Sequence, residues 1–406
     1  MAGFHPLFAV DHEKPALATY AANHPGTITT PDEIQDLDPF EIMRTLKLGP
    51  GELDVLVGGP PCQGFSTYGK RDPGDLRNQL YQHYLRFVEA FRPRRFVIEN
   101  VSGILSMMGG AIVEDICARA AGLGYRLEIY TLDASDYGVP QRRTRVFFLA
   151  SSEGEAPGPP ERTNSTSSAA QAELFGDALP PAITVGEAIS DLPAAALPPA
   201  RTHETMAYAS APQSQYQTWV RGSEREVSAH SAKQMMAVRR LRLALLRPGD
   251  YGSVLRRRIR EDGLPREVIA ELLGDGSSSM RDVSQCRTVD RAADQQLRDL
   301  LARGHLDIDE VLAAVDSGGF ANKYRRLRSD SPSHTLVAHM ARDCSDFVHP
   351  ELDRFISVRE AARLQSFPDS FQFQGSQFQQ LRQIGNAVPP LLGRSIALSV
   401  RKSLVT

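Results

Sequence analysis

The chain has 406 residues, of which 41% are hydrophobic and 23% are charged, and its formal net charge is −3. This composition predicts a folded globular protein and excludes extensive disorder, and no apolar run approaches the roughly 20 residues of a membrane span. Polar residues in Met1–Lys14 predict no signal peptide. The four cysteines are far apart without a CxxC spacing, so we expect no disulfide framework, no metal site and a reducing, cytoplasmic setting.

Short apolar runs alternate with helical patterns through residues 1–150, which predicts an α/β domain with a largely parallel sheet. Strands are predicted at residues 8–11, 53–57, 96–99 and 146–150, and helices at 78–91 and 111–123. Residues 151–200 are rich in Pro, Ala, Ser and Gly, which is typical of a linker. Capping boxes predict helices that begin at Thr184 and Ser357.

The first chemical motif, GGPPCQGFS at residues 58–66, follows the strand predicted at 53–57. Ligand sites in open α/β sheets lie beyond the carboxyl ends of strands, so this turn presents Cys62 at the sheet edge. The Cys62 thiolate is there a candidate nucleophile. A buried structural cysteine in a tight turn is the alternative for a lone cysteine.

Further motifs carry ionisable groups. Glu99 closes an apolar strand, at the same edge as Cys62 if the strands are parallel, and partial burial would raise its pKa and make it a proton donor. In QRRTR, residues 141–145, Arg143 and Arg145 alternate, so both can face a phosphate or a base carbonyl. The alternatives are that the glutamate caps a following helix and that the arginines are solvent-exposed residues at the start of a strand. The run GNAVPP at residues 385–390 alone predicts a turn.

Together and in this order, PPCQ, ENV, QRRTR and GNAVPP resemble the motifs of the DNA cytosine-5 methyltransferase family. The resemblance covers about residues 1–195 and 320–406. It implies a Rossmann-like α/β sheet of the S-adenosylmethionine-dependent methyltransferase type, with a smaller target-recognition domain. The implied boundaries are 1–195 for the first part of the catalytic and cofactor domain, 196–325 for target recognition with its preceding linker, and 326–406 for the return to the catalytic domain.

The resemblance also implies the chemistry. Cys62 matches the cysteine whose thiolate adds to C6 of a cytosine in double-stranded DNA, and Glu99 matches the carboxylate that protonates or hydrogen-bonds N3. Arg143 and Arg145 match the arginine pair of the site, with one of them near cytosine O2. The methyl group comes from S-adenosylmethionine, and the base must leave the duplex stack because the reaction needs both of its faces.

The cofactor positions match less completely. Asp11 matches the acid that binds the ribose hydroxyls, His12 the residue that packs on adenine, and Glu33 the residue near the adenine amino group, with Asp32 as the alternative. Other matches to the cofactor lining are Pro60, Leu80, Asn386 and Val388. For Leu80 and Val388, plain core packing is equally consistent with the sequence.

One family feature is missing. Members normally begin with a strand and an FxGxGG turn that cradles the methionine part of the cofactor, and no FxGxGG occurs in this sequence. Without this central strand, backbone groups would stay unpaired and an apolar gap would remain. Three explanations compete: Met1 is an internal methionine of a longer chain, which we favour; a second polypeptide supplies the strand; or the product is truncated and inactive.

The middle of the chain is basic, with eleven Arg and Lys against three acids from Arg221 to Arg260. It matches the target-recognition domain by position, and a set of its arginines is expected to contact phosphates or a groove, although each could equally be an ordinary solvated side chain. The set is Arg239, Arg240, Arg242, Arg256, Arg257, Arg258 and Arg260.

We therefore expect a DNA methyltransferase of restriction–modification or phage defence, with cognate restriction or defence proteins as partners, no membrane association and a monomeric state. The alternatives are a cofactor-deficient DNA-binding remnant or subunit that needs a partner strand, and an RNA methyltransferase of the related tRNA-modifying branch.

Overall fold

The computed structural model describes residues 2–61, 80–165, 179–195, 204–233, 235, 237–264, 288–303, 308–315 and 323–405. Contacts within the chain divide it into two compact units. Unit 1 comprises Met1–Ile183 and Val388–Thr406, and unit 2 comprises Thr184–Ala387. The functional boundaries expected at residues 195 and 325 remain predictions.

Unit 1 contains the elements that the apolar runs predict, together with two further strands. Its strands are β1 (Phe8–Val10), β2 (Ile28–Thr30), β3 (Val55–Gly58), β4 (Arg95–Asn100), β5 (Arg126–Asp133) and β6 (Thr144–Ser151). Its helices are α1 (Lys14–Asn23), α2 (Pro39–Leu46), α3 (Leu80–Phe91), α4 (Ala111–Gly122) and α15 (Pro390–Val405), with 3-10 turns η3 (Ser102–Gly110) and η4 (Ala134–Tyr137). The strands and helices predicted in residues 1–150 are confirmed, whereas β2 and β5 were not predicted.

Two sheets are formed by these strands. The larger has the order β3-β4-β6-β5, and β1 pairs with β2 in a separate two-stranded sheet. The expected parallel pairing holds for β1 with β2 and for β3 with β4. One strand of the larger sheet departs from the expected parallel arrangement: β6 runs antiparallel to both of its neighbours, so β3, β4 and β5 share one direction and β6 has the other.

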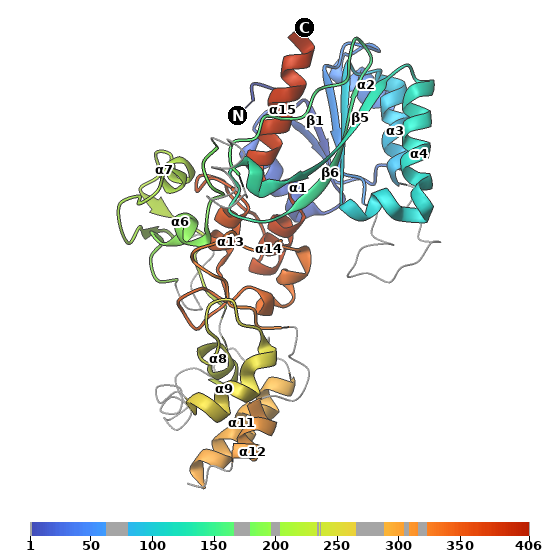
Figure 1. Cartoon of the computed structure of the whole chain (residues 1–406). Helices are drawn as coiled ribbons and strands as arrows, with labels where there is room; N and C mark the ends of the chain where they lie inside the picture. Colours follow the sequence, from blue (N-terminus) through green and yellow to red (C-terminus); the bar gives the residue numbers. More distant parts are fainter. Residues whose placement is uncertain are drawn as a thin grey trace. The chain divides into compact units, whose positions relative to one another are not determined.

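Helices cover both faces of the four-stranded sheet (Figure 1). Side chains of a strand alternate between the two faces of its sheet, and β6 follows this rule with apolar residues on both. Val146, Phe148 and Ala150 pack in the core shared with α3 and α4, while Phe147 and Leu149 pack in the core shared with α15. Burial on both faces explains the unbroken apolar run of this strand.

Tyr84 of α3 lies under the parallel pair β3–β4. Its hydroxyl is 3.0 Å from the carbonyl oxygens of both Leu56 and Val97. Its ring occupies the space beside Gly58, where an added Cβ would lie 2.5 Å from the ring carbons. Glycine at position 58 therefore permits the close approach of α3 to the end of β3.

The outer edge of β3 is open in the part of the chain that the structure describes, since β4 is its one neighbour there. Val57 on this strand exposes 68% of its surface, which is unusual for valine in a sheet. The edge is thus both apolar and without a paired strand among the described residues.

Unit 2 is mainly helical, with one short antiparallel pair of strands. Its elements are α6 (Val185–Ile189), β7 (Met206–Ala207), α7 (Gln215–Arg221), β8 (Glu226–Val227), α8 (Ala237–Ala244), η5 (Gly252–Val254), α9 (Leu255–Asp262), α11 (Thr288–Ala302), α12 (Ile308–Val315), η7 (Ala338–Ala341), η8 (Cys344–Asp346), α13 (Val358–Leu364) and α14 (Gln377–Asn386). The predicted capping boxes at Thr184 and Ser357 are confirmed, and both form their reciprocal hydrogen bonds.

A buried ionic network joins α6, α7 and α13. The guanidinium of Arg363 is inaccessible to solvent, contacts the carboxylate of Asp191, and donates to both carboxylate oxygens of Asp369 at 3.0 and 2.7 Å. Arg221 donates to Asp191 at 2.6 Å, and the Tyr208 hydroxyl donates to Asp369 at 2.7 Å. Each buried charge therefore has an opposite charge and hydrogen-bond partners, which is the condition for keeping it ionised in the interior.

Candidate active site

The carboxylate of Glu99 lies at the end of β4, beside the turn that leads to Cys62. Gly58, the last residue of β3, pairs with Ile98 in parallel register, so both strands end at the same edge of the sheet and β4 extends two residues further. The Glu99 side chain is 18% exposed, and a Cβ added to Gly59 would lie 3.2 Å from its Oε2. The parallel pairing on which the prediction for Glu99 depends is confirmed. Cys62 lies outside the described residues, so its place at the same edge stays a prediction.

Asn100 connects the end of β4 to this turn. Its side-chain Nδ2 donates to the carbonyl oxygen of Pro60 at 3.0 Å, and its Oδ1 accepts from the backbone N–H of Val101 at 2.9 Å. Only 5% of Asn100 is exposed. The sequence analysis assigns Asn100 no role, and the signal it offers is an amide directly after a strand-end acid.

Both predicted arginines act on Glu99. Arg145 Nε lies 3.0 Å from Glu99 Oε1, and the Arg145 side chain is 13% exposed. Arg143 is 1% exposed and interacts electrostatically with the same carboxylate. The structure thus brings three of the four predicted catalytic residues together at one edge of the sheet.

Burial raises the pKa of Glu99 above its usual range, and the charges of Arg145 and Arg143 offset part of that rise. The direction agrees with the sequence prediction. A raised pKa keeps a larger fraction of the carboxyl protonated near neutral pH, as a proton donor requires. Burial also lowers the pKa of Arg143 to about 9, which leaves its guanidinium cationic at pH 7.

Asp11 and His12 follow β1 at its carboxyl end. The Asp11 side chain is 47% exposed, and its Oδ1 accepts from the backbone N–H of Glu13 at 2.8 Å. The backbone N–H of Asp11 points to the carbonyl oxygen of Thr30, the last residue of β2, at 3.4 Å. His12 is 56% exposed, with ring nitrogens 3.8 Å from Asp11 and 3.6 Å from Glu13. An accessible carboxylate therefore stands where parallel strands end.

Glu33 lies in a turn just after β2. The turn is closed by a hydrogen bond from the Asp36 N–H to the Glu33 carbonyl oxygen at 3.0 Å, and the residue is exposed. The alternative acid, Asp32, accepts a hydrogen bond from the hydroxyl of Thr30. Glu33 thus keeps an accessible carboxylate, whereas Asp32 is already engaged with its neighbour.

The remaining predicted cofactor residues have different surroundings. Pro60 is buried, and Leu80 is the partly buried first residue of α3. Val388 packs against the core shared by β6 and α15, as its core-packing alternative predicts. Asn386 is the exposed last residue of α14 in unit 2.

These residues suit the adenosine part of S-adenosylmethionine. Asp11 and Glu33 supply accessible acceptors, and ribose hydroxyls and an adenine amino group are hydrogen-bond donors. The methionine part is different, because the sequence contains no FxGxGG turn to surround it. The acceptors present are therefore compatible with the adenosine end of the cofactor, and their role in binding stays a prediction.

The expected DNA-contacting arginines of unit 2 divide into two groups. Arg242 is fully buried and donates from Nε to the Val315 carbonyl oxygen at 2.7 Å. Arg258 is 7% exposed, with Nη2 3.0 Å from Asp250. The expectation that these two contact DNA is wrong, because they lie on the buried faces of α8 and α9. The exposed members of the set are Arg240, Arg256, Arg257 and Arg260, and Arg239 is partly buried.

Among the described residues, no cluster of three or more His, Cys, Asp or Glu could hold a metal ion. No helix in the part of the chain that the structure describes is long and apolar enough to cross a membrane.

Comparisons with known proteins agree on one family. The profile of the C-5 cytosine-specific DNA methylases matches residues 1–402. The type II methyltransferase M.AgeI of Thalassovita gelatinovora is 53% identical over 99% of this chain and 95% of its own length. The type II methyltransferase M.DdeI of Desulfomicrobium norvegicum is 32% identical over 98% of this chain and 83% of its own.

A solved structure shares the fold. It is described as a DNA modification methyltransferase encoded within a prophage of E. coli, and it superposes with a TM-score of 0.66 at 23% identity. The match covers the whole of this chain and 94% of the solved one.

Proposed function

Since the chain belongs to the C-5 cytosine-specific DNA methylase family, whose members use S-adenosylmethionine, we propose that it methylates C5 of cytosine in double-stranded DNA through a covalent bond from Cys62 to C6. The observation that carries the proposal is the Glu99 carboxyl. It has a raised pKa, pairs with Arg145, and stands beside the turn before Cys62.

The chemistry assigns separate tasks to these residues. C5 of cytosine is a poor nucleophile, and a sulfur–carbon bond from the Cys62 thiolate to C6 shifts electron density to C5. Negative charge that develops on the ring reaches N3, where Glu99 donates its proton or a hydrogen bond. Arg145 holds the Glu99 carboxyl in place at 3.0 Å and can also face the base carbonyl.

When bound, S-adenosylmethionine supplies an electrophilic methyl group for C5. Asp11 and Glu33 would accept hydrogen bonds from its ribose and adenine, and His12 would lie against the adenine. After C5 has lost its proton to a base, the bond between sulfur and C6 breaks, a proton that N3 received returns to Glu99, and the Cys62 thiolate is restored. The cytosine must be outside the duplex stack for Cys62 to reach C6.

Replacement of the nucleophile tests this mechanism. Cys62→Ala is expected to abolish methyl transfer, and Cys62→Ser to leave at most a trace because serine lacks the thiolate. DNA containing 5-fluorocytosine should form a covalent adduct with the unaltered chain and none with Cys62→Ala. Cys117→Ala is the matched control, since Cys117 is partly buried and burial raises its thiol pKa. An adduct that survives Cys62→Ala would identify a different nucleophile.

We propose restriction–modification or phage defence as the biological role, with cognate restriction or defence proteins as partners and a monomeric enzyme. The support is that the two bacterial relatives named above are type II methyltransferases. Expression in a host without cytosine methylation should place 5-methylcytosine at one short recognition sequence. Methylation scattered over unrelated sequences, or methylated tRNA in place of DNA in a tritiated methyl-transfer assay, would contradict this role.

A second candidate is a DNA-binding subunit that holds the cofactor only when a partner supplies a strand. The open edge of β3, with Val57 68% exposed, favours it. Titration of the chain with S-adenosylmethionine in a calorimeter separates the two candidates. Heat of binding supports the complete enzyme, and its absence supports the subunit.

A further inference from the structure

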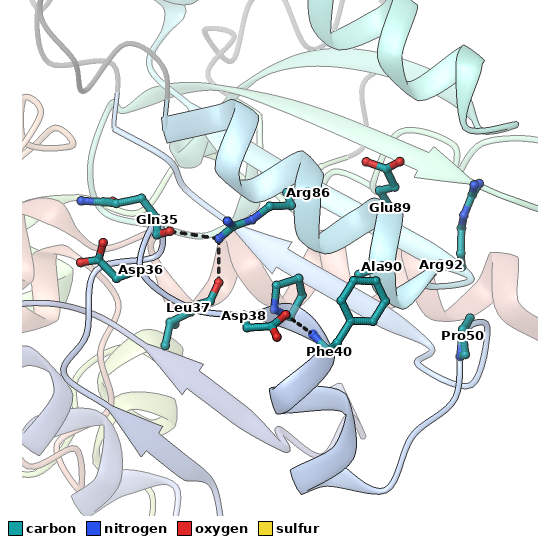
Figure 2. Close-up of a pocket in the computed structure, with 11 residues that line it drawn as sticks. Gln35, Asp36, Leu37, Asp38, Phe40, Pro50, Arg86, Glu89, Ala90 and Arg92 are labelled. Atoms are coloured by element: carbon teal, nitrogen blue, oxygen red, sulfur yellow. Dashed lines mark hydrogen bonds between the residues drawn. The ribbon is translucent and has the colours of Figure 1, made fainter.

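Arg86 of α3 holds the turn that carries Glu33. Its Nη2 donates to three backbone carbonyl oxygens of this turn, those of Ile34 at 3.0 Å, Gln35 at 3.3 Å and Leu37 at 2.7 Å. Figure 2 shows the guanidinium hydrogen-bonded to Gln35 and Leu37, at a pocket lined by residues 35–40 and by α3. Hydrogen bonds from a charged donor are stronger than those from a neutral one, so one side chain fixes the path of several consecutive peptide groups.

This contact matters because of the way unit 1 is built. Among the described residues, the β1–β2 pair shares no ladder with the four-stranded sheet. Asp11 and Glu33 follow β1 and β2, whereas Glu99 belongs to β4 of the larger sheet. Helix α3 packs in the core against Phe96 and Ile98 of β4. Arg86 is therefore a polar link between the cofactor end and the reaction end of the unit.

Apolar packing also supports this turn. Ile34 packs against both core clusters that include α3, and Leu37 against the cluster of α2 and α3. Asp38, next along the chain, caps α2 by accepting from the Phe40 N–H at 2.9 Å. These contacts remain when the guanidinium is removed, so the fold of the unit does not depend on Arg86 alone.

We propose that Arg86 is a positioning residue for S-adenosylmethionine: its three hydrogen bonds hold the turn of Glu33 in the conformation that binds the adenosine part. The inference rests on the proposed function, because it takes Glu33 and Asp11 as cofactor contacts. Arg86 acts through the turn and contacts neither the methyl group nor the cytosine.

Three variants of the full chain test this role. Arg86→Met, which keeps the apolar stem, is expected to raise the Kd for S-adenosylhomocysteine and the KM for S-adenosylmethionine by about 10- to 100-fold. The kcat at saturating cofactor and the KM for DNA should stay within about threefold of the unaltered values. Arg86→Lys should restore part of the affinity, because its ammonium can still donate to a carbonyl. Arg119→Met is the matched control, since Arg119 pairs with Asp115 on the exposed face of α4.

A double variant adds a readout that mere destabilisation would not produce. If Arg86 acts through Glu33, Arg86→Met added to Glu33→Gln should weaken binding much less than it does alone. Additive losses, an unchanged Kd in Arg86→Met, or a kcat that falls with KM unchanged would each overturn the proposal.

The outcomes also separate this proposal from the proposed function. If the unaltered chain binds S-adenosylhomocysteine but methylates no cytosine, the function fails while the Arg86 comparison is still measured by affinity. If the unaltered chain methylates DNA and Arg86→Met binds normally, only the role of Arg86 fails. No binding by the unaltered chain overturns both.

Discussion

Replacing Asn100 with alanine should slow attack by Cys62 and also weaken the fold. The variant loses the hydrogen bond from Nδ2 to the Pro60 carbonyl oxygen and the one from the Val101 N–H to Oδ1. Each such bond contributes about 0.5–1.5 kcal/mol net, so the free energy of unfolding should fall by about 1–3 kcal/mol. Cys62 follows Pro60 by two residues, and a displacement of about 1 Å at a reacting group can cost about 100-fold in rate.

The assay is the single-turnover rate of adduct formation with 5-fluorocytosine DNA, measured beside urea unfolding. We expect Asn100→Ala to form the adduct about 10- to 100-fold more slowly. Tyr125→Phe is the control, because it removes a buried hydrogen bond of 2.7 Å to Pro93 at the opposite end of β4. It should lower the free energy of unfolding by about 0.5–1.5 kcal/mol, the contribution of one such bond, and leave the adduct rate unchanged. An Asn100→Ala chain that forms adduct at the parent rate would refute the reasoning.

Arg145→Met is expected to raise the pKa of Glu99 further, because it removes a cation 3.0 Å away. The alkaline limb of the plot of kcat/KM against pH should therefore move to higher pH. An unmoved limb would mean that another group titrates there. Arg363→Met leaves the buried carboxylates of Asp191 and Asp369 without this cation and should lower the free energy of unfolding by about 3–5 kcal/mol. Unfolding can be followed by the fluorescence of the single tryptophan, Trp219. Arg240 is exposed, and Arg240→Gln should weaken DNA binding. A plot of the logarithm of the binding constant against the logarithm of the salt concentration should become less steep by about 0.9. A slope equal to that of the unaltered chain would exclude a phosphate contact.

Local patterns predicted the elements that are buried on both faces or capped by their own side chains. The unbroken apolar run predicts β6 from a few neighbouring residues, and the capping boxes at Thr184 and Ser357 predict the start of their helices in the same way. β5 was not predicted, since it alternates polar with apolar residues at the edge of the sheet. Such a pattern is weaker than an unbroken run, because its strand character depends on the pairing with β6.

The site followed from motifs where chemistry and position coincide, as for Glu99 and Arg145. What could not be predicted were contacts made across the fold. Nothing local shows that Arg86 reaches the turn of Glu33, or that Arg242 faces inward to a carbonyl oxygen of α12. Arginine is a residue type that is usually found at the surface. Only the packing of neighbouring elements decides whether the helix face that carries each of these arginines is buried.

Position 58 illustrates how distant parts of the sequence constrain each other. The space that a side chain would need there is filled by the ring of Tyr84, so a larger residue at 58 requires a smaller one at 84. A larger residue at 58 alone would push the helix from the strand, and a smaller residue at 84 alone would leave a cavity there. Across natural variants, these two positions should therefore change in concert, and an engineer who wishes to reshape this corner of the molecule must redesign them as a pair.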